Sequence, residues 1–199
     1  MSQCKGGTLG CRLFLKGDTV MIYQSNQMEE TALLATAAAM CAAARTAPKG
    51  KGIDTIETLV LTGAEKDALA DKMEEIARRE FGGNPNNWYF RDADNLRQSG
   101  AVVLIGAHRT HRGIPFCSYC GFENCAACQA AGGTCGFTHL DMGIALGSAC
   151  AVAADARVDN RIMFSIGKAA AEMGYVEADV LWNGIPLSIS GKSPFFDRK

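Results

Sequence analysis

Five cysteines gather in one short stretch of the chain, and their spacing suits a metal centre. They lie within residues 117–135, at Cys117, Cys120, Cys125, Cys128 and Cys135. Thiolates separated by such short spacers can share a zinc ion or an iron-sulfur cluster. A cysteine that only fills space in a hydrophobic core has no reason to recur in this way. The stretch therefore predicts a metal site, and we expect the chemistry of the protein there.

The spacing between the cysteines helps to distinguish these two kinds of centre. Cys117 and Cys120 form one Cys-x2-Cys arm, and Cys125 and Cys128 form another, with only residues 121–124 between the arms. In zinc ribbons and fingers the arms usually stand about 12 to 20 residues apart, whereas bacterial ferredoxins wrap closely spaced cysteines around a cluster. The spacing therefore favours an iron-sulfur cluster, with structural zinc as the alternative. Spacing alone would choose Cys128 as the fourth ligand.

Other polar residues near the cysteines are weaker candidates. His108, His111 and His139 flank the stretch, but five thiols already exceed the four ligands that a cluster needs, so we expect polar loop residues here. Asp141 and Asp159 follow without forming a close carboxylate pair. We expect these two carboxylates at surface and helix-capping positions and not in acid-base catalysis.

The composition argues against several classes of protein. The chain has 199 residues with 20 basic and 21 acidic side chains, and no basic stripe suits it to nucleic acid or an anionic membrane. Its nine cysteines are an odd number, and the N-terminus does not resemble a secretory signal, so a disulfide scaffold is not expected. The most apolar stretch, residues 32–44, is too short to cross a bilayer. We therefore expect a cytoplasmic protein whose partner is a redox protein or a small molecule.

Helical and strand-like patterns alternate along residues 21–199, which we expect to form one domain with a cysteine-rich loop at 108–136. Residues 1–20 contain several glycines and are expected to be a loosely ordered extension in which Cys4 and Cys11 are bystander thiols. The patterns predict helices at 29–45, 62–81, 138–154 and 159–172, and strands at 55–61, 88–90, 101–105 and 180–182. Strands separated by helices indicate an α/β or an α+β fold.

A few positions predict how the helices begin, end and pack. Thr62 starts a capping-box pattern, and Asp159 suits the N-cap of the last helix. Gly174 suits the position just after that helix. Gly143 and Gly147 lie four residues apart, which lets another backbone approach closely, so we expect tight packing there.

Several motifs resemble a family described as uncharacterised proteins containing a ferredoxin domain. The resemblance extends over nearly all of residues 21–198 and rests on 43–54, on Cys117-x2-Cys120-Gly-x3-Cys125, on 141–148 with 158–163, and on 191–198. It implies a [4Fe-4S] cluster held by Cys117, Cys120, Cys125 and a further cysteine shortly before the next helix, which here is Cys135. Cys128 is then an extra thiol and the alternative fourth ligand. The resemblance implies a cofactor without implying a reaction.

The order of helices and strands is also similar to that of flavin-dependent nitroreductases. This resemblance implies an α+β fold with a central sheet of about four to five strands flanked by long helices, and a homodimer. Nitroreductases hold the FMN phosphate with basic residues, a role that would fall to Arg45, Lys49 and Lys51 in this chain. We therefore predict an electron-transfer protein with a [4Fe-4S] cluster. The alternatives are a zinc-binding interaction protein and an FMN-dependent oxidoreductase that the cysteine loop supplies with electrons.

Overall fold

The structure, a computed structural model, describes residues 22–176 and 179–196. The expected extension at 1–20, with its two cysteines, lies outside this part of the chain. The described elements are α1 (Ser25–Thr46), η1 (Gly50–Gly52), β1 (Ile56–Thr62), α2 (Gly63–Phe81), α3 (Trp88–Gln98), β2 (Ala101–His108), α4 (Cys125–Ala130), α5 (Gly136–Asp155), β3 (Asp159–Asn160), α6 (Phe164–Met173) and β4 (Val180–Ser188).

The described strands form one four-stranded antiparallel sheet in the order β1-β2-β4-β3. β2 is paired along its whole length with β4, with Ala101 opposite Leu187 and His108 opposite Val180. Its residues from Ala101 to Ala107 are all buried, because helices cover the strand on both sides. The fold is therefore α+β, as the resemblance implied, and the apolar run of β2 was predicted correctly.

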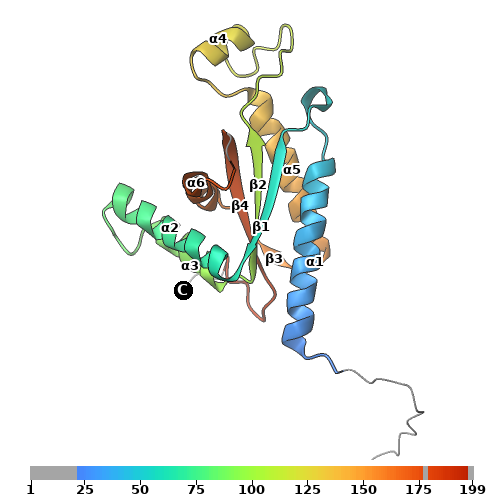
Figure 1. Ribbon diagram of the computed structural model, residues 1–199, viewed down its shortest axis with the longest axis vertical. Helices are drawn as coiled ribbons and strands as arrows, with labels where there is room; N and C mark the ends of the chain where they lie inside the picture. Colours follow the sequence, from blue (N-terminus) through green and yellow to red (C-terminus); the bar gives the residue numbers. More distant parts are fainter. Residues whose placement is uncertain (1–21, 177–178, 197–199) are drawn as a thin grey trace, which may run out of the picture.

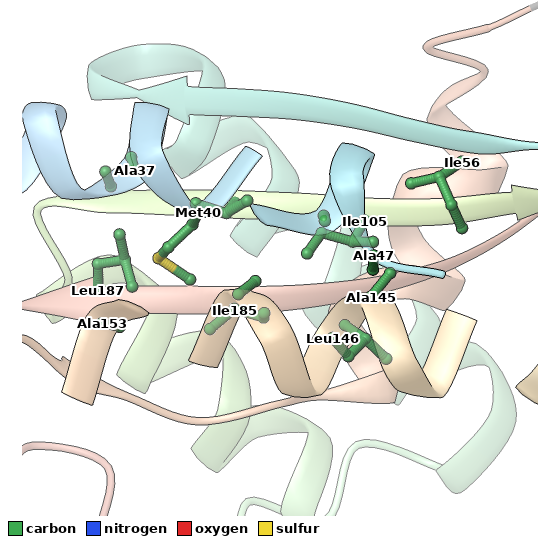
Figure 2. Packing of buried hydrophobic residues seen from close by; sticks show 14 of the residues in the cluster. Ala37, Met40, Ala47, Ile56, Ile105, Ala145, Leu146, Ala153, Ile185 and Leu187 are labelled. Carbon is green, nitrogen blue, oxygen red and sulfur yellow. The ribbon is translucent and has the colours of Figure 1, made fainter. Parts of the chain in front are cut away.

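Helices cover both faces of the sheet (Figure 1). α1 and α5 pack against each other on one face, and α2, α3 and α6 cover the other. Side chains of β2 alternate between the two layers, since successive residues of a strand point to opposite faces. Val103 and Ile105 join the core under α1 and α5, whereas Val102 and Leu104 join the core under α2, α3 and α6. Figure 2 shows the first core, into which Met40 of α1 points.

α1 and α5 consist mainly of small and apolar residues. α1 buries Leu33, Ala37, Met40 and Ala44 at helical spacing. By length and composition alone α5 could cross a membrane, a test that core helices of soluble proteins also pass, and only 39% of its apolar window is buried. The outward side of α5 is therefore largely apolar as well as its inward side.

α6 lies directly on β4, backbone against backbone. Gly167 of α6 faces the carbonyl group of Trp182, and a Cβ at this position would overlap the carbonyl oxygen. On β2, the side chains of Trp182 and Val180 similarly fill the space above Gly106. These close approaches require glycine and fix how α6 sits on the sheet.

The strand predicted at 88–90 is wrong, because these residues form the first turn of α3. The side chain of Asn87 accepts a hydrogen bond from the backbone N–H of Tyr89 at 2.9 Å and caps the helix. Three consecutive aromatic residues have high strand propensity, but the cap and the packing of α3 against α2 override it.

Two predicted boundaries near the C-terminus are also wrong. Asp159 does not cap a helix; it pairs with Ser188 in β3, and α6 begins only at Phe164. The strand predicted at 180–182 continues to Ser188. The sequence did not predict the second half of this strand because Gly184 and Pro186 lie in it, and both residue types usually weaken a strand.

The predictions for two helix ends are confirmed, whereas the prediction for the packing of two glycines is wrong. Thr62 is the N-cap residue of α2, as predicted, although its side chain forms no capping hydrogen bond. Gly174 ends α6 in the left-handed region with φ of 68°, as predicted. The tight packing predicted at Gly143 and Gly147 does not occur within the described chain, because no atom lies within 4 Å of a Cβ placed on either residue.

Candidate metal centre

The cysteine loop projects from one end of the sheet. Residues 109–135 connect β2 to α5, contain α4, and extend beyond the sheet (Figure 1). On either side of Cys117, Phe116 and Ser118 have positive φ values of 54° and 43°. This conformation is uncommon for residues other than glycine, and where it occurs it tends to cluster at functional sites.

Four of the five clustered cysteines line one cavity. It has a volume of about 80 Å³, and its cysteines are Cys117, Cys120, Cys125 and Cys135. The rest of its wall consists of residues from the same loop and the first residue of α5, namely Ile114, Pro115, Phe116, Ser118, Phe122, Glu123, Asn124 and Gly136. The structure thus places around one hollow the same four residues that the family resemblance implied.

Cys128 is placed differently from the other four cysteines. It lies in α4 and is completely buried, and it is not part of the cavity wall. A Cβ placed on Gly133 would lie 2.9 Å from both the Cys128 sulfur and the Phe122 ring, so Cys128 packs tightly beneath the loop. Its thiol also forms a hydrogen bond with Cys120.

These two neighbouring thiols differ in acidity. The backbone N–H of Phe122 donates to the Cys120 sulfur and is the main reason why the pKa of Cys120 is lowered; the N–H of Gly136 acts in the same direction. Burial raises the pKa of Cys128, and its hydrogen bond to Cys120 raises this pKa further. Cys120 is therefore the more acidic thiol of the pair and loses its proton more readily, and the thiolate is the form in which cysteine binds metals.

Cys135 occupies the N-cap position of α5 and is almost completely buried. The first N–H groups of a helix have no partners within it, and the helix dipole favours negative charge at this end. The Cys135 side chain thus lies at the positive end of the α5 dipole.

The cysteines do not yet form a finished coordination sphere. Within residues 22–176 and 179–196, no three His, Cys, Asp or Glu side chains are arranged to hold a metal ion. A metal or cluster would thus require the loop to bring its thiolates inward around the cavity. Such adjustment is common, because metal binding and local folding are often coupled.

A buried ion pair ties the base of the loop to the scaffold. Arg112 donates to the Asp141 carboxylate across 2.8 Å, and both side chains are almost completely buried. Arg112 also donates to Thr55 Oγ1 at 2.9 Å, and Asp141 accepts from the Gly50 N–H at 2.9 Å. The prediction that Asp141 lies at the surface was therefore wrong. The sequence did contain a signal for the burial of Asp141, because this residue lies within a mainly apolar helix.

The three flanking histidines lie outside the cavity wall. His108 Nε2 is 2.9 Å from Glu57 Oε1 on the neighbouring strand β1. His111 is half-buried, and its Nε2 has no hydrogen-bond partner among the described residues. His139 is exposed on α5. None of the three histidines therefore contributes to the cavity that the four cysteines line.

The basic residues predicted to hold a flavin phosphate have acceptors within the chain. Arg45 pairs with Asp54 at 2.6 Å, and Lys49 Nζ lies 3.6 Å from the same carboxylate. Lys49 also donates to carbonyl oxygens at the C-terminal end of α1, and Lys51 donates to the Arg112 carbonyl at 3.1 Å. A phosphate group would have to displace these contacts.

Similarity to other proteins extends along most of the chain. A family model described as "uncharacterized protein containing a ferredoxin domain" matches residues 131–198. An uncharacterised protein from Archaeoglobus fulgidus is 42% identical over 186 residues, which are 89% of this chain and 98% of that protein. The chain belongs to the ferredoxin-domain family. The residues matched by the family model include Cys135 and α5.

Several solved structures that are similar to this ferredoxin-domain protein are described as nitroreductases. A putative nitroreductase in complex with FMN from Desulfovibrio desulfuricans has a TM-score of 0.53 and 14% identity, covering 83% of this chain and 78% of its own. A nitroreductase family protein from Clostridium novyi NT has a TM-score of 0.54 and 11% identity, covering 78% and 73%. At these identities the likeness establishes the fold alone, which is nitroreductase-like, as predicted.

Proposed function

We propose that this ferredoxin-domain protein is an electron carrier that holds a [4Fe-4S] cluster with Cys117, Cys120, Cys125 and Cys135. The observation that supports the proposal most directly is the cavity lined by these four cysteines. A cluster of this kind has four thiolate ligands, and when bound it supplies one-electron redox chemistry. Membership of the ferredoxin-domain family agrees with such a cofactor.

The residues around the cavity suit an anionic cluster. The N–H groups of Phe122 and Gly136 point at Cys120, and hydrogen bonds to ligand sulfurs tune the reduction potential. The Phe122 ring packs over the buried Cys128, which would remain a spare thiol beside the ligands. The chain would thus limit solvent access and stabilise the charge on the thiolates.

Two other functions use the same parts of the molecule. The four thiols would also suit tetrahedral zinc in a structural interaction protein. An FMN-dependent oxidoreductase is the other alternative, which the FMN-bound structural neighbour favours; Arg45, Lys49 and Lys51 would then bind the flavin phosphate.

Anaerobic purification followed by absorption spectroscopy and metal analysis separates these three functions. We expect brown protein with broad visible absorption and about four iron and four sulfide ions per chain. Bound flavin would instead give two resolved yellow bands. Colourless protein that contains one zinc ion per chain and no iron would contradict the cluster.

Substitution of single cysteines tests the ligand assignment. Cys135→Ser should remove most of the bound iron, because Cys135 lines the cavity, whereas Cys128→Ser should leave the iron content nearly unchanged. Cys150→Ser is the matched control, since this half-buried cysteine of α5 packs against the core and not the cavity. Iron lost with Cys128→Ser and retained with Cys135→Ser would make Cys128 the fourth ligand.

We also propose that the protein is a cytoplasmic homodimer. Leu140, Gly143, Ile144 and Gly147 form an exposed apolar stripe on α5, which suits contact with another protein surface. A second copy is the partner that the fold resemblance implies. A reducing compartment suits the clustered cysteines, because oxidation to disulfides would remove the thiolates that bind metal.

A further inference from the structure

A large groove lies at the end of the sheet opposite the cysteine loop. It is formed by α3, by Arg161 after β3, and by the segment after β4, and its volume is about 1400 Å³. Its wall consists of Arg91, Asp94, Asn95, Gln98, Arg161, Ser190, Lys192, Pro194, Phe195 and Phe196. Residues from two motifs of the family resemblance, Arg161 from one and 192–196 from the other, therefore meet here although they are remote from the proposed cluster.

The charge of the groove suits an anion. The wall contains three basic residues, Arg91, Arg161 and Lys192, and one acidic residue, Asp94. Arg91 is partly neutralised by Asp92 at 2.8 Å. Lys192 forms no ion pair with any described residue. Arg161 uses one donor for the Phe195 carbonyl at 2.9 Å. Arg161 and Lys192 thus leave donors available for phosphate oxygens.

An aromatic ring is exposed beside these cations. Phe196 is 61% exposed, and the Arg161 guanidinium lies 5.3 Å from the centre of its ring. The neighbouring Phe195 is buried, so it anchors the segment that carries Phe196. A planar base could stack on this ring, as bases do on aromatic side chains in nucleic-acid-binding proteins.

Asn95 contributes a carboxamide to the groove. The residue is only 7% exposed, yet it lines the groove. Its polar atoms are not among the fully buried ones that lack a partner, so they are accessible to a ligand in the groove. The carboxamide offers a donor and an acceptor side by side, the arrangement that pairs with the N6 and N7 atoms of adenine.

We propose that this groove binds an adenine nucleotide, with the base between Asn95 and Phe196 and the phosphates at Arg161 and Lys192. The ligand is either a free adenosine phosphate or the adenine half of a dinucleotide, since both present the same base and phosphate groups. The groove exceeds the roughly 300–1000 Å³ of ordinary small-molecule pockets, so either ligand has room. This site does not depend on the proposed cluster.

Isothermal titration calorimetry of the full chain with ATP, AMP, NAD⁺, GTP and pyrophosphate tests the proposal. We expect ATP or NAD⁺ to bind at least about tenfold more tightly than GTP, because guanine offers an acceptor where adenine offers its N6 donor. Tighter binding of ATP and AMP identifies the free nucleotide, and tighter binding of NAD⁺ identifies the dinucleotide. No measurable binding of any adenine ligand would overturn the proposal.

Variants assign the binding to the groove. Lys192→Ala should weaken both ATP and pyrophosphate about tenfold, whereas Asn95→Ala and Phe196→Ala should weaken ATP and leave pyrophosphate unchanged. Lys168→Ala removes the same charge from an exposed position of α6 outside the groove and should have no effect. Equal binding of ATP and pyrophosphate that Asn95→Ala and Phe196→Ala do not alter would reject the adenine site. Far-ultraviolet circular dichroism checks that each variant is folded.

Discussion

The two helix layers cover the same sheet but present different surfaces to their surroundings. On α2, α3 and α6, outward side chains form ion pairs between helices, such as Arg79 with Glu172 at 2.7 Å and Arg97 with Glu74. On α1 and α5, charged residues such as Glu29 and Asp155 are exposed near the helix ends, and the outward positions between them hold mainly alanine, glycine and larger apolar residues such as Ile144. Paired charges suit a surface that faces water, whereas a wide apolar surface suits contact with a protein.

The difference shows that burial against the sheet does not reveal which layer has a partner. Both layers contribute methionine, leucine and alanine side chains to well-packed cores. Only the outward faces differ, and on α5 the residues Gly143 and Gly147 leave open space where a backbone could approach. The outer face of α1 and α5 is therefore the place to test for a second copy of the chain.

The largest effect is expected from Gly167→Ala, because the new methyl group would overlap the backbone carbonyl of Trp182. We expect a loss of more than about 4 kcal/mol in the free energy of unfolding. The matched change Gly147→Ala adds a methyl group in open space and should stabilise the monomer by up to about 1 kcal/mol. Urea denaturation of dilute protein measures the free energy of unfolding of both variants. Equal losses would contradict the conclusion that Gly167 contacts the backbone of β4 whereas Gly147 has free space beside it.

A smaller loss of stability is expected from Asp141→Asn. This variant tests the buried ion pair between Arg112 and Asp141 of α5. The change leaves the Arg112 charge buried without its partner and should lower the free energy of unfolding by about 3–5 kcal/mol. Asp155→Asn, at the exposed end of the same helix, is the control and should be nearly neutral. If both variants unfold alike in urea, the ion pair does not hold the loop to the scaffold.

Self-association tests the apolar face directly. Ile144→Glu places a charge on the outward side of α5 and should weaken a dimer at least about tenfold without unfolding the chain. Lys168→Glu on the exposed side of α6 should leave association unchanged. Analytical ultracentrifugation measures both variants, and wild-type protein that stays monomeric at all concentrations would rule out the homodimer.

The smallest effect is expected from Glu172→Gln in the charged layer. Arg79 donates to Glu172 and is the main reason why the pKa of this carboxyl is lowered. The ion pair therefore contributes stability that is complete above the ordinary Glu pKa of about 4.3 and is lost as the pH falls through the lower pKa of the folded state. At pH 7 we expect Glu172→Gln to lose about 0.5 kcal/mol, and the difference between the variant and wild type should shrink as the pH is lowered below about 4. A difference that stays constant as the pH is lowered would show that the carboxylate is not responsible.

Patterns of local burial and spacing were sufficient for the long elements. β2 was predicted because a strand buried on both faces leaves a continuous apolar run in the sequence. α2 was predicted because a helix buried along one stripe leaves apolar residues at helical spacing. Asp159 and Trp88 were assigned wrongly because their local propensities yield to sheet pairing and helix packing. Asp141 and the groove at Asn95 depend on residues that meet only in the folded chain, so no pattern along the sequence could locate their partners.

Neither hydrophobic core contains a residue of the cysteine loop at 109–135. The scaffold can therefore pack both of its cores without the loop. With the cluster proposed above, synthesis of the polypeptide would be separate from delivery of iron and sulfide. Iron limitation would then change the proportion of cluster-loaded molecules and not the amount of folded protein.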